Sequence, residues 1–311
     1  MFVSCSTNYF APYRYSRYYY GVNILILFFF FALGCIIGSF LNVVLFRYNT
    51  GRTIGGRSKC FSCRRTLTPI DLVPVLSYLV FRGRCRTCKS HVSFQYPSVE
   101  MLTGVLFGAV YLLYAPLLLI NPALFLFDVS IALIVMSLLV LITVYDLRHK
   151  IIPDLFSYTF AAVTFIAMFL RLETAVNETP VGNFSGFALY LAIPEMSHLF
   201  AGIILAFPFY FLWLVSRGRW MGLGDAKLAL GIGWFLGLAK GGTAIIYGFW
   251  IGAVVSILLI VAQKIYVRKL NKKGSTSITM KSEIPFAPFL IAGLLIVYFF
   301  GYNMFSVLEM I

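Results

Sequence analysis

Long apolar runs are the feature that most constrains how this chain can fold. An α-helix needs about 20 apolar residues to cross the hydrocarbon core of a bilayer, and runs near this length recur from one end of the chain to the other. Of the 311 residues, 60% are hydrophobic and only 12% are charged. We therefore predict an all-α polytopic membrane protein with about eight transmembrane helices. The predicted spans are 22–46, 98–120, 124–145, 155–171, 198–216, 226–239, 243–263 and 284–302.

The distribution of lysine and arginine predicts the orientation of these helices. Short cytoplasmic loops of membrane proteins carry an excess of both residues. Here 21 of the 25 fall in four connections, which are 47–97, 146–154, 217–227 and 264–283. These connections are predicted to be cytoplasmic, with both termini outside. Because the basic residues follow the membrane borders, the net charge of +14 does not indicate nucleic acid as a partner.

This orientation divides the chain into four parts. They are an extracytoplasmic tail (1–21), a first transmembrane helix (22–46), a cytoplasmic four-cysteine loop (47–97) and a membrane core (98–311). The first helix is expected to be retained and not cleaved as a signal peptide, because its apolar run continues to Arg47. We expect a multi-pass membrane protein in contact with membrane lipid; the family resemblance described below implies the bacterial inner membrane as its location.

The loop 47–97 contains two pairs of cysteines with metal-ligand spacing. Cys60 and Cys63 form the first pair, Cys85 and Cys88 form the second, and 21 residues separate the pairs. Two such turns can close a tetrahedral site around zinc, which would be structural because four thiolates leave no open position. The alternatives are disulfides, which a reducing cytoplasm disfavours, a redox role for one pair, and unmetallated thiols.

Two acidic residues are predicted to meet at the cytoplasmic border of the membrane. Asp146 ends the helix predicted over 124–145, and Asp225 opens the helix predicted over 226–239 at an exposed turn. Gly222 and Gly224 beside it would allow a close approach of backbone or substrate, or would let the chain turn into the helix. An acid at membrane depth is costly and indicates function. Two neighbouring carboxyl groups share one proton, so one can act as general base and the other as general acid. That arrangement is typical of aspartic proteases.

Structural roles are the alternative for every acid near a helix end. Asp154 would cap the helix 155–171, and Glu100 would interact with the dipole at the start of the helix 98–120. The two candidate catalytic aspartates could likewise cap helices or pair with Arg148 or Lys227. Other hydrolase signatures are missing, since the sequence contains neither a GxSxG nor an HExxH pattern.

Seven stretches of the sequence, in order along the chain, resemble the bacterial prepilin peptidase family, also called the type IV leader peptidase family. They are GSFLNVVLFR (38–47), CFSC (60–63), DLVPVLSYLVFRGRCRTC (71–88), QYPSVE (95–100), DLRHKIIPD (146–154), GLGDAKL (222–228) and IPFAPFL (284–290). The resemblance implies that Asp146 and Asp225 form the catalytic dyad of a membrane aspartic endopeptidase of the GxGD class.

The same resemblance implies a substrate and a second activity. The family cleaves the short basic leader from type IV prepilins and pseudopilins, after a glycine, at the cytoplasmic face of the membrane. It commonly also methylates the new N-terminal amine with S-adenosyl-L-methionine, so the enzyme would be multifunctional and would serve the type IV pilus or protein secretion.

Two other classes of function compete with this prediction. A proton-coupled membrane transporter also uses membrane aspartates, although those usually lie near the bilayer midplane on broken helices within repeated halves. A membrane scaffold stabilised by zinc would need no catalytic residues. Cleavage of a prepilin-like peptide by the purified protein would distinguish both of them from the peptidase.

Overall fold

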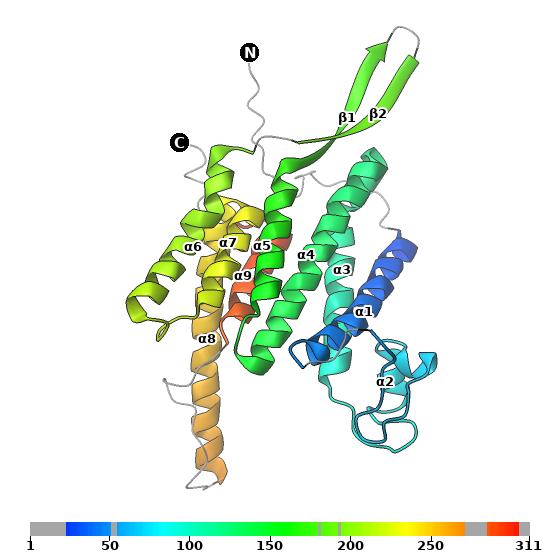
Figure 1. The fold of residues 1–311 in the computed structure, drawn as a ribbon, viewed down its shortest axis with the longest axis vertical. Coiled ribbons are helices and arrows are strands. Elements are labelled where there is room, and N and C mark those ends of the chain that lie inside the picture. The colour runs from blue at the N-terminus through cyan, green and yellow to red at the C-terminus, as the bar shows by residue number, and fades with distance from the viewer. Residues whose placement is uncertain (1–22, 51–54, 180–181, 192–193, 271–284, 305–311) are drawn as a thin grey trace. The chain divides into compact units, whose positions relative to one another are not determined.

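A computed structural model describes residues 23–50, 55–179, 182–191, 194–270 and 285–304 (Figure 1). The predicted tail 1–21 and most of the connection 264–283 lie outside these residues. The described chain divides into two compact units. The first contains 23–144 with 172–189, and the second contains 145–171 with 190–304.

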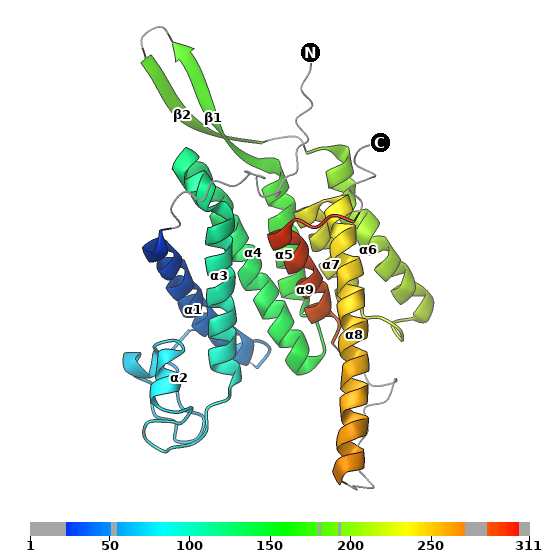
Figure 2. The same cartoon turned by 180° about the vertical axis from the view of Figure 1, so that it is seen from behind.

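The first unit is built on α1 (Ile24–Arg47) and α3 (Gln95–Ile120), followed by most of α4 (Pro122–His149). Figure 2 shows α1 and α3 side by side. A Cβ atom added at Gly34 would lie 2.6 Å from the Thr103 carbonyl oxygen, and one at Gly38 would lie 2.8 Å from Cα of Glu100. Glycine therefore permits the close approach of these two helices, as small residues commonly do in membrane bundles.

The loop between α1 and α3 contains two short helical elements. They are the 3₁₀-helix η1 (Pro69–Leu72) and the helix α2 (Leu76–Val80). The side chain of Asp71 accepts hydrogen bonds from the backbone N–H and the hydroxyl of Thr68, and it pairs with Arg65. The hydrogen bond from the Thr68 backbone contributes most to lowering the pKa of Asp71. This capping box orders the loop between its two cysteine pairs.

The second unit is arranged around α7 (Leu223–Leu236). It also contains α5 (Asp154–Phe169), α6 (Met196–Ser216), α8 (Leu238–Leu270) and α9 (Ala287–Phe300). α7 contacts each of these four helices, and it is largely buried. A Cβ atom at Gly233 would lie 2.6 Å from Cα of Gly202 in α6, and one at Gly231 would overlap the ring of Phe160 in α5. The small residues of α7 thus let its neighbours pack directly against its backbone.

All eight predicted helices are present among the described residues, with ends shifted by at most seven residues. Five of them are long and apolar enough to cross a membrane. These are α1, α3, α4, α6 and the part of α8 from Leu238 to Gln263. α5, α7 and α9 have 16, 14 and 14 residues. The predicted apolar helices are therefore confirmed. Their length and composition support five membrane spans, not the eight that were predicted.

One segment differs from the all-α prediction. β1 (Leu170–Thr179) and β2 (Gly182–Leu191) form a two-stranded sheet in the connection between the predicted spans 155–171 and 198–216, and β1 also takes up the last two residues of the first span. The reason is visible in the composition. Proline and glycine, which favour turns, separate two stretches that contain valine, threonine, phenylalanine and tyrosine, which favour strands.

Candidate active site

Asp146 lies in the last turn of α4 and is buried, with 4% of its surface exposed. Its Oδ2 accepts a hydrogen bond from the backbone N–H of Ala287, at 3.2 Å. Ala287 is the first residue of α9, where N–H groups have no acceptor within their own helix. The carboxylate therefore joins the end of one helix to the start of another that is 141 residues away in sequence.

Asp225 lies in the first turn of α7 and is also buried, with 8% of its surface exposed. The prediction that it occupies an exposed turn was wrong. The helix begins two residues earlier than Asp225, after the N-cap residue Gly222, and the backbone N–H of Asp225 donates to the carbonyl of Gly222 at 3.3 Å. The turn is thus part of a helix that its neighbours cover.

The glycines before Asp225 have different roles. A Cβ atom at Gly224 would lie 2.8 Å from Cβ of Ile152, so a larger residue would force the two segments apart. At Gly222 an added Cβ would lie 3.8 Å from the Asp225 carboxylate, which is an ordinary contact. A close neighbour is therefore found at Gly224 but not at Gly222, and it is a side chain, whereas the prediction was an approach of backbone or substrate. This contact packs the segment that follows α4 against the start of α7.

The structure brings Asp146 and Asp225 together within the second unit, where their carboxyl groups interact electrostatically. Lys227 does not neutralise Asp225. Its Nζ donates to Asp154 at 2.6 Å and lies 4.6 Å from the centre of the Tyr158 ring. A buried pair of carboxyl groups can hold one proton between them and exchange it with a bound water, which is the requirement for general acid and base catalysis.

Asp154 differs from these two aspartates in its surroundings. It is the first residue of α5, the N-cap residue is Pro153, and no side-chain cap bond forms. The prediction that Asp154 caps this helix was therefore wrong. Its side chain is 70% exposed and forms the ion pair with Lys227.

Two further acids belong to the first unit. Glu100 was expected at the start of a helix, but α3 begins five residues earlier, and Glu100 is a buried residue of its second turn. It accepts a hydrogen bond from the backbone N–H of Val75 at 2.7 Å and so ties the loop to α3. Asp128, a half-buried residue in the second turn of α4, was overlooked in the sequence analysis. Asp128 could have been noticed from the sequence, because it is an acidic residue inside the predicted membrane helix 124–145.

The four loop cysteines form one cluster. The Sγ atoms of Cys60, Cys63, Cys85 and Cys88 all lie within 4.8 Å of one another. Those of Cys60 and Cys88 are 3.8 Å apart. In a tetrahedral site with zinc–sulfur bonds of about 2.3 Å, neighbouring sulfurs are about 3.8 Å apart. The cluster could therefore bind a metal ion, and its donor set fits zinc.

Each cysteine pair sits in the same kind of turn. The backbone N–H of Cys60 donates to Arg65, and that of Arg64 donates back to Cys60, both at 2.9 Å. The corresponding bonds from Cys85 to Ser90 and from Lys89 to Cys85 measure 2.8 and 3.0 Å. Arg64 and Lys89 have positive φ values of 58°, which bend the chain so that both sulfurs face one point.

The surroundings of these turns act differently on the thiols. The backbone hydrogen bond from Arg65 lowers the pKa of Cys63, but desolvation and the hydrogen bonds with Cys60 and Cys88 outweigh it and raise this pKa to about 11. The pKa values of Cys60 and Cys88 are lowered instead. A bond from the backbone N–H of Cys63 is the main cause that lowers the pKa of Cys60 to about 6. The hydroxyl of Ser90, 3.1 Å from the Cys88 sulfur, is the main cause that lowers the pKa of Cys88. Because thiolates are the species that bind metals, both pKa shifts favour metal binding near neutral pH.

The described residues thus define a helical protein with five candidate membrane spans, a buried pair of aspartates and a four-cysteine cluster in the loop between α1 and α3. Residues 32–114, which include the cluster, match the Bacterial Peptidase A24 N-terminal domain. Residues 133–257, which include both aspartates, match the Type IV leader peptidase family. The chain belongs to the bacterial type of the Peptidase A24, or prepilin leader peptidase/N-methyltransferase, family.

Several relatives align with most of the chain. The Prepilin leader peptidase/N-methyltransferase of Bacillus subtilis (strain 168) is 28% identical over 89% of this chain and 95% of its own length. The protein of the same name from Myxococcus xanthus (strain DK1622) is 31% identical over 75% of this chain and 63% of its own length. The Type 4 prepilin-like proteins leader peptide-processing enzyme of Escherichia coli O78:H11 (strain H10407 / ETEC) is 30% identical over 66% of this chain and 74% of its own length. No solved structure matches the chain.

Proposed function

We propose that this protein is a membrane aspartic endopeptidase that removes the leader peptide from type IV prepilins or pseudopilins. The observation that carries the proposal is the buried pair Asp146 and Asp225, placed by α4 and α7 within the region that matches the leader peptidase family. The names of the relatives support the substrate class.

In the proposed mechanism, a water molecule lies between the two aspartates. The ionised carboxylate removes a proton from this water, and the water oxygen attacks the carbonyl carbon of the scissile peptide bond. The protonated partner donates its proton to the carbonyl oxygen, which gives a gem-diol intermediate. As the C–N bond breaks, the first carboxyl group gives the proton that it took from water to the leaving amine, and a hydroxyl of the gem-diol returns a proton to the partner. No covalent enzyme intermediate forms. The hydrogen bond from Ala287 to Asp146 would keep one carboxylate oriented while the proton moves.

The site would lie at the cytoplasmic face of the bacterial inner membrane, in a protein that crosses the membrane eight times. The arrangement of basic residues supports this orientation. α7 has 14 residues, so it is roughly 21 Å long and shorter than the usual hydrocarbon thickness of about 30 Å. A short helix that begins beside Asp225 would leave the carboxyl pair recessed from the membrane surface, where water can reach it.

The four-cysteine cluster would hold one structural zinc ion. Four thiolate ligands close the coordination shell, so this zinc would stabilise the loop and take no part in hydrolysis. Methylation of the new N-terminus with S-adenosyl-L-methionine is proposed from the names of the relatives. No residue of the described chain is assigned to the methyl donor.

A proton-coupled transporter remains the competing function. Transporter acids usually lie near the bilayer midplane on broken helices. Asp146 lies in the last turn of α4 and Asp225 in the first turn of α7, and both helices are continuous. This placement favours the peptidase.

Mass spectrometry of a prepilin co-expressed with this protein tests the proposed reaction. We expect the substrate to lose the mass of its leader and to gain the mass of one methylene unit at its new N-terminus. The same prepilin expressed alone is the control. An uncleaved substrate, with the protein present in the membrane, would contradict the peptidase. A cleaved but unmethylated product would contradict methyl transfer alone.

Labelling of single introduced cysteines tests the orientation. In a background with Cys5→Ser and Cys35→Ser, Asn177→Cys is expected to react with a membrane-impermeant thiol reagent in intact cells. Thr50→Cys is expected to react only after the cells are permeabilised, because the loop that contains it is rich in basic residues. Ready labelling of Thr50→Cys in intact cells would reverse the proposed orientation.

A further inference from the structure

The second half of the four-cysteine loop contains a cavity of about 530 Å³ with an unusual concentration of positive charge. Four cationic side chains line it, together with His91, the apolar residues Val80 and Phe81, and Cys85 of the four-cysteine cluster. The four are Arg82, Arg84, Arg86 and Lys89. We call this cavity the basic pocket. All four of these side chains are exposed, so charged groups are available to a ligand.

The positive charge of the basic pocket is not balanced by acidic residues. No lining residue is acidic. The two ion pairs found among the described residues use Arg65 with Asp71 and Lys227 with Asp154, all outside the pocket. A zinc ion with four thiolates has a net charge near −2, which the four lining cations exceed. The surplus positive charge favours an anionic ligand.

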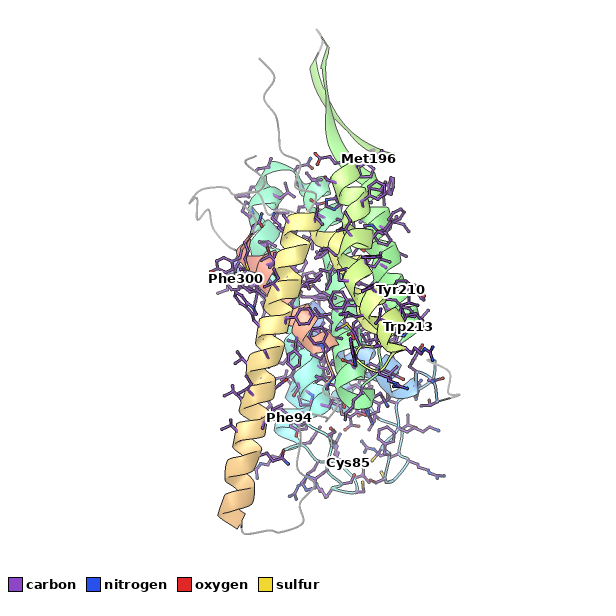
Figure 3. The ribbon with its side chains drawn as sticks, turned by 90° about the vertical axis from the view of Figure 1, so that its left-hand side faces the viewer. Cys85, Phe94, Met196, Tyr210, Trp213 and Phe300 are labelled. Atoms are coloured by element: carbon purple, nitrogen blue, oxygen red, sulfur yellow. The ribbon has the colours of Figure 1, made fainter. Side chains whose placement is uncertain are left out.

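An apolar surface adjoins the basic pocket. The side chains of Leu76, Leu79 and Val80 in α2 are 59%, 64% and 71% exposed, and Val80 also lines the pocket. Phe94, just before α3, is 72% exposed, and its ring lies 6.3 Å from that of Tyr78 in α2. Figure 3 shows Phe94 close to the loop that contains Cys85. Exposed apolar side chains of this size are costly in water and indicate that something covers them.

The α2 surface and the basic pocket are joined by local contacts and share Val80. Gly83 turns the chain after α2 with a φ of 66°, and a Cβ atom there would lie 2.8 Å from the Tyr78 ring. The ring thus packs against the turn that leads to Arg84, and the bridge between Arg84 and His91 closes the far side. Apolar and basic groups therefore face a ligand together.

The position of the loop brings this surface to a bilayer border. α1 ends at Arg47 and α3 begins at Gln95, and both helices are candidate membrane spans that pack along each other. The side-chain amide of Asn42 donates to the carbonyl of Tyr96 at 3.1 Å, which holds the two helix ends together. The loop is thus anchored on both sides at one end of a pair of membrane helices.

We propose that the basic pocket and α2 form a docking site for the membrane surface. The pocket binds the phosphate of an anionic phospholipid headgroup, and Leu76, Leu79 and Val80 enter the boundary between headgroups and acyl chains. Amphipathic elements with basic and apolar groups bind anionic membranes in this way. A leader peptide with basic residues, or the cationic methyl donor, would be repelled by the same pocket.

Hydrogen exchange of the full-length protein in lipid nanodiscs tests this site. We expect amides of residues 76–91 to exchange at least about fivefold more slowly in phosphatidylglycerol-containing discs than in pure phosphatidylcholine, since one basic residue near an anionic surface contributes about that factor. Arg84→Gln with Arg86→Gln should remove most of this difference. Arg57→Gln with Lys59→Gln, which removes the same charge from positions of the same loop outside the pocket, should preserve it.

Two further measurements keep the result interpretable. The metal content of each variant shows whether the loop is intact. If the metal content of the variant with Arg84→Gln and Arg86→Gln falls, Arg84→Gln alone is used in its place. Leu79→Gln with Val80→Gln should also reduce the difference, because it removes the apolar part of the site. Equal exchange in the two kinds of disc would overturn the proposal. Slowing by inorganic phosphate in phosphatidylcholine discs would overturn the lipid as ligand, because a free anion would then suffice.

Discussion

Asp146→Asn and Asp225→Asn are each expected to lower prepilin cleavage by at least about 10³-fold. Asparagine keeps the size and polarity of aspartate, but it can neither accept a proton from water nor return one. In the Asp146→Asn variant the new amide oxygen could still accept the hydrogen bond from Ala287, so the contact between α4 and α9 should survive. Cleavage is measured at matched abundance of each variant in the membrane.

Asp154→Asn is the matched control for this pair. It makes the same chemical change at an exposed position whose partner is Lys227, and most activity should remain. The double variant of Asp146 and Asp225 should be little worse than either single variant, because the pair acts as a unit. If the two aspartates only capped helices, asparagine would still cap, and loss of a cap costs only about 1 kcal/mol. Near-normal cleavage by either single variant would therefore exclude the proposed mechanism.

Cys60→Ser together with Cys63→Ser is expected to abolish metal binding by the loop. Elemental analysis of the unmodified protein should find about one zinc ion per chain, because its four sulfurs lie at distances that fit a single tetrahedral site. Without the metal, residues 55–94 should become more susceptible to proteolysis, since much of the binding energy of a structural zinc is folding energy.

Cys35→Ser is the control for the zinc experiment. Cys35 is buried in α1, outside the cluster, so its replacement should leave the zinc content unchanged. Full zinc occupancy in the variant with Cys60 and Cys63 replaced would show that these thiols are not ligands. The metal would then have to be bound elsewhere.

The sequence by itself determined the helices and the cysteine cluster. Hydropathy and charge are local properties, and a long apolar run can satisfy its backbone in a bilayer only as a helix. The pairing of Cys60 with Cys63 and of Cys85 with Cys88 was equally visible, because a tight turn brings together residues that are three positions apart. The strands β1 and β2 were not predicted, because they lie between long apolar runs and hydropathy alone does not distinguish a strand there from a loop.

Only the tertiary structure decided which acids are buried and what they contact. Three aspartates lie at the ends of predicted helices. Asp146 and Asp225 are buried, whereas Asp154 is exposed and forms an ion pair with Lys227. The contact of Asp146 with Ala287 and that of Gly224 with Ile152 join segments far apart along the chain. Such contacts depend on which helices pack against α7 and α9. That packing is set by the shapes of side chains from several helices at once, which no local pattern in the sequence contains.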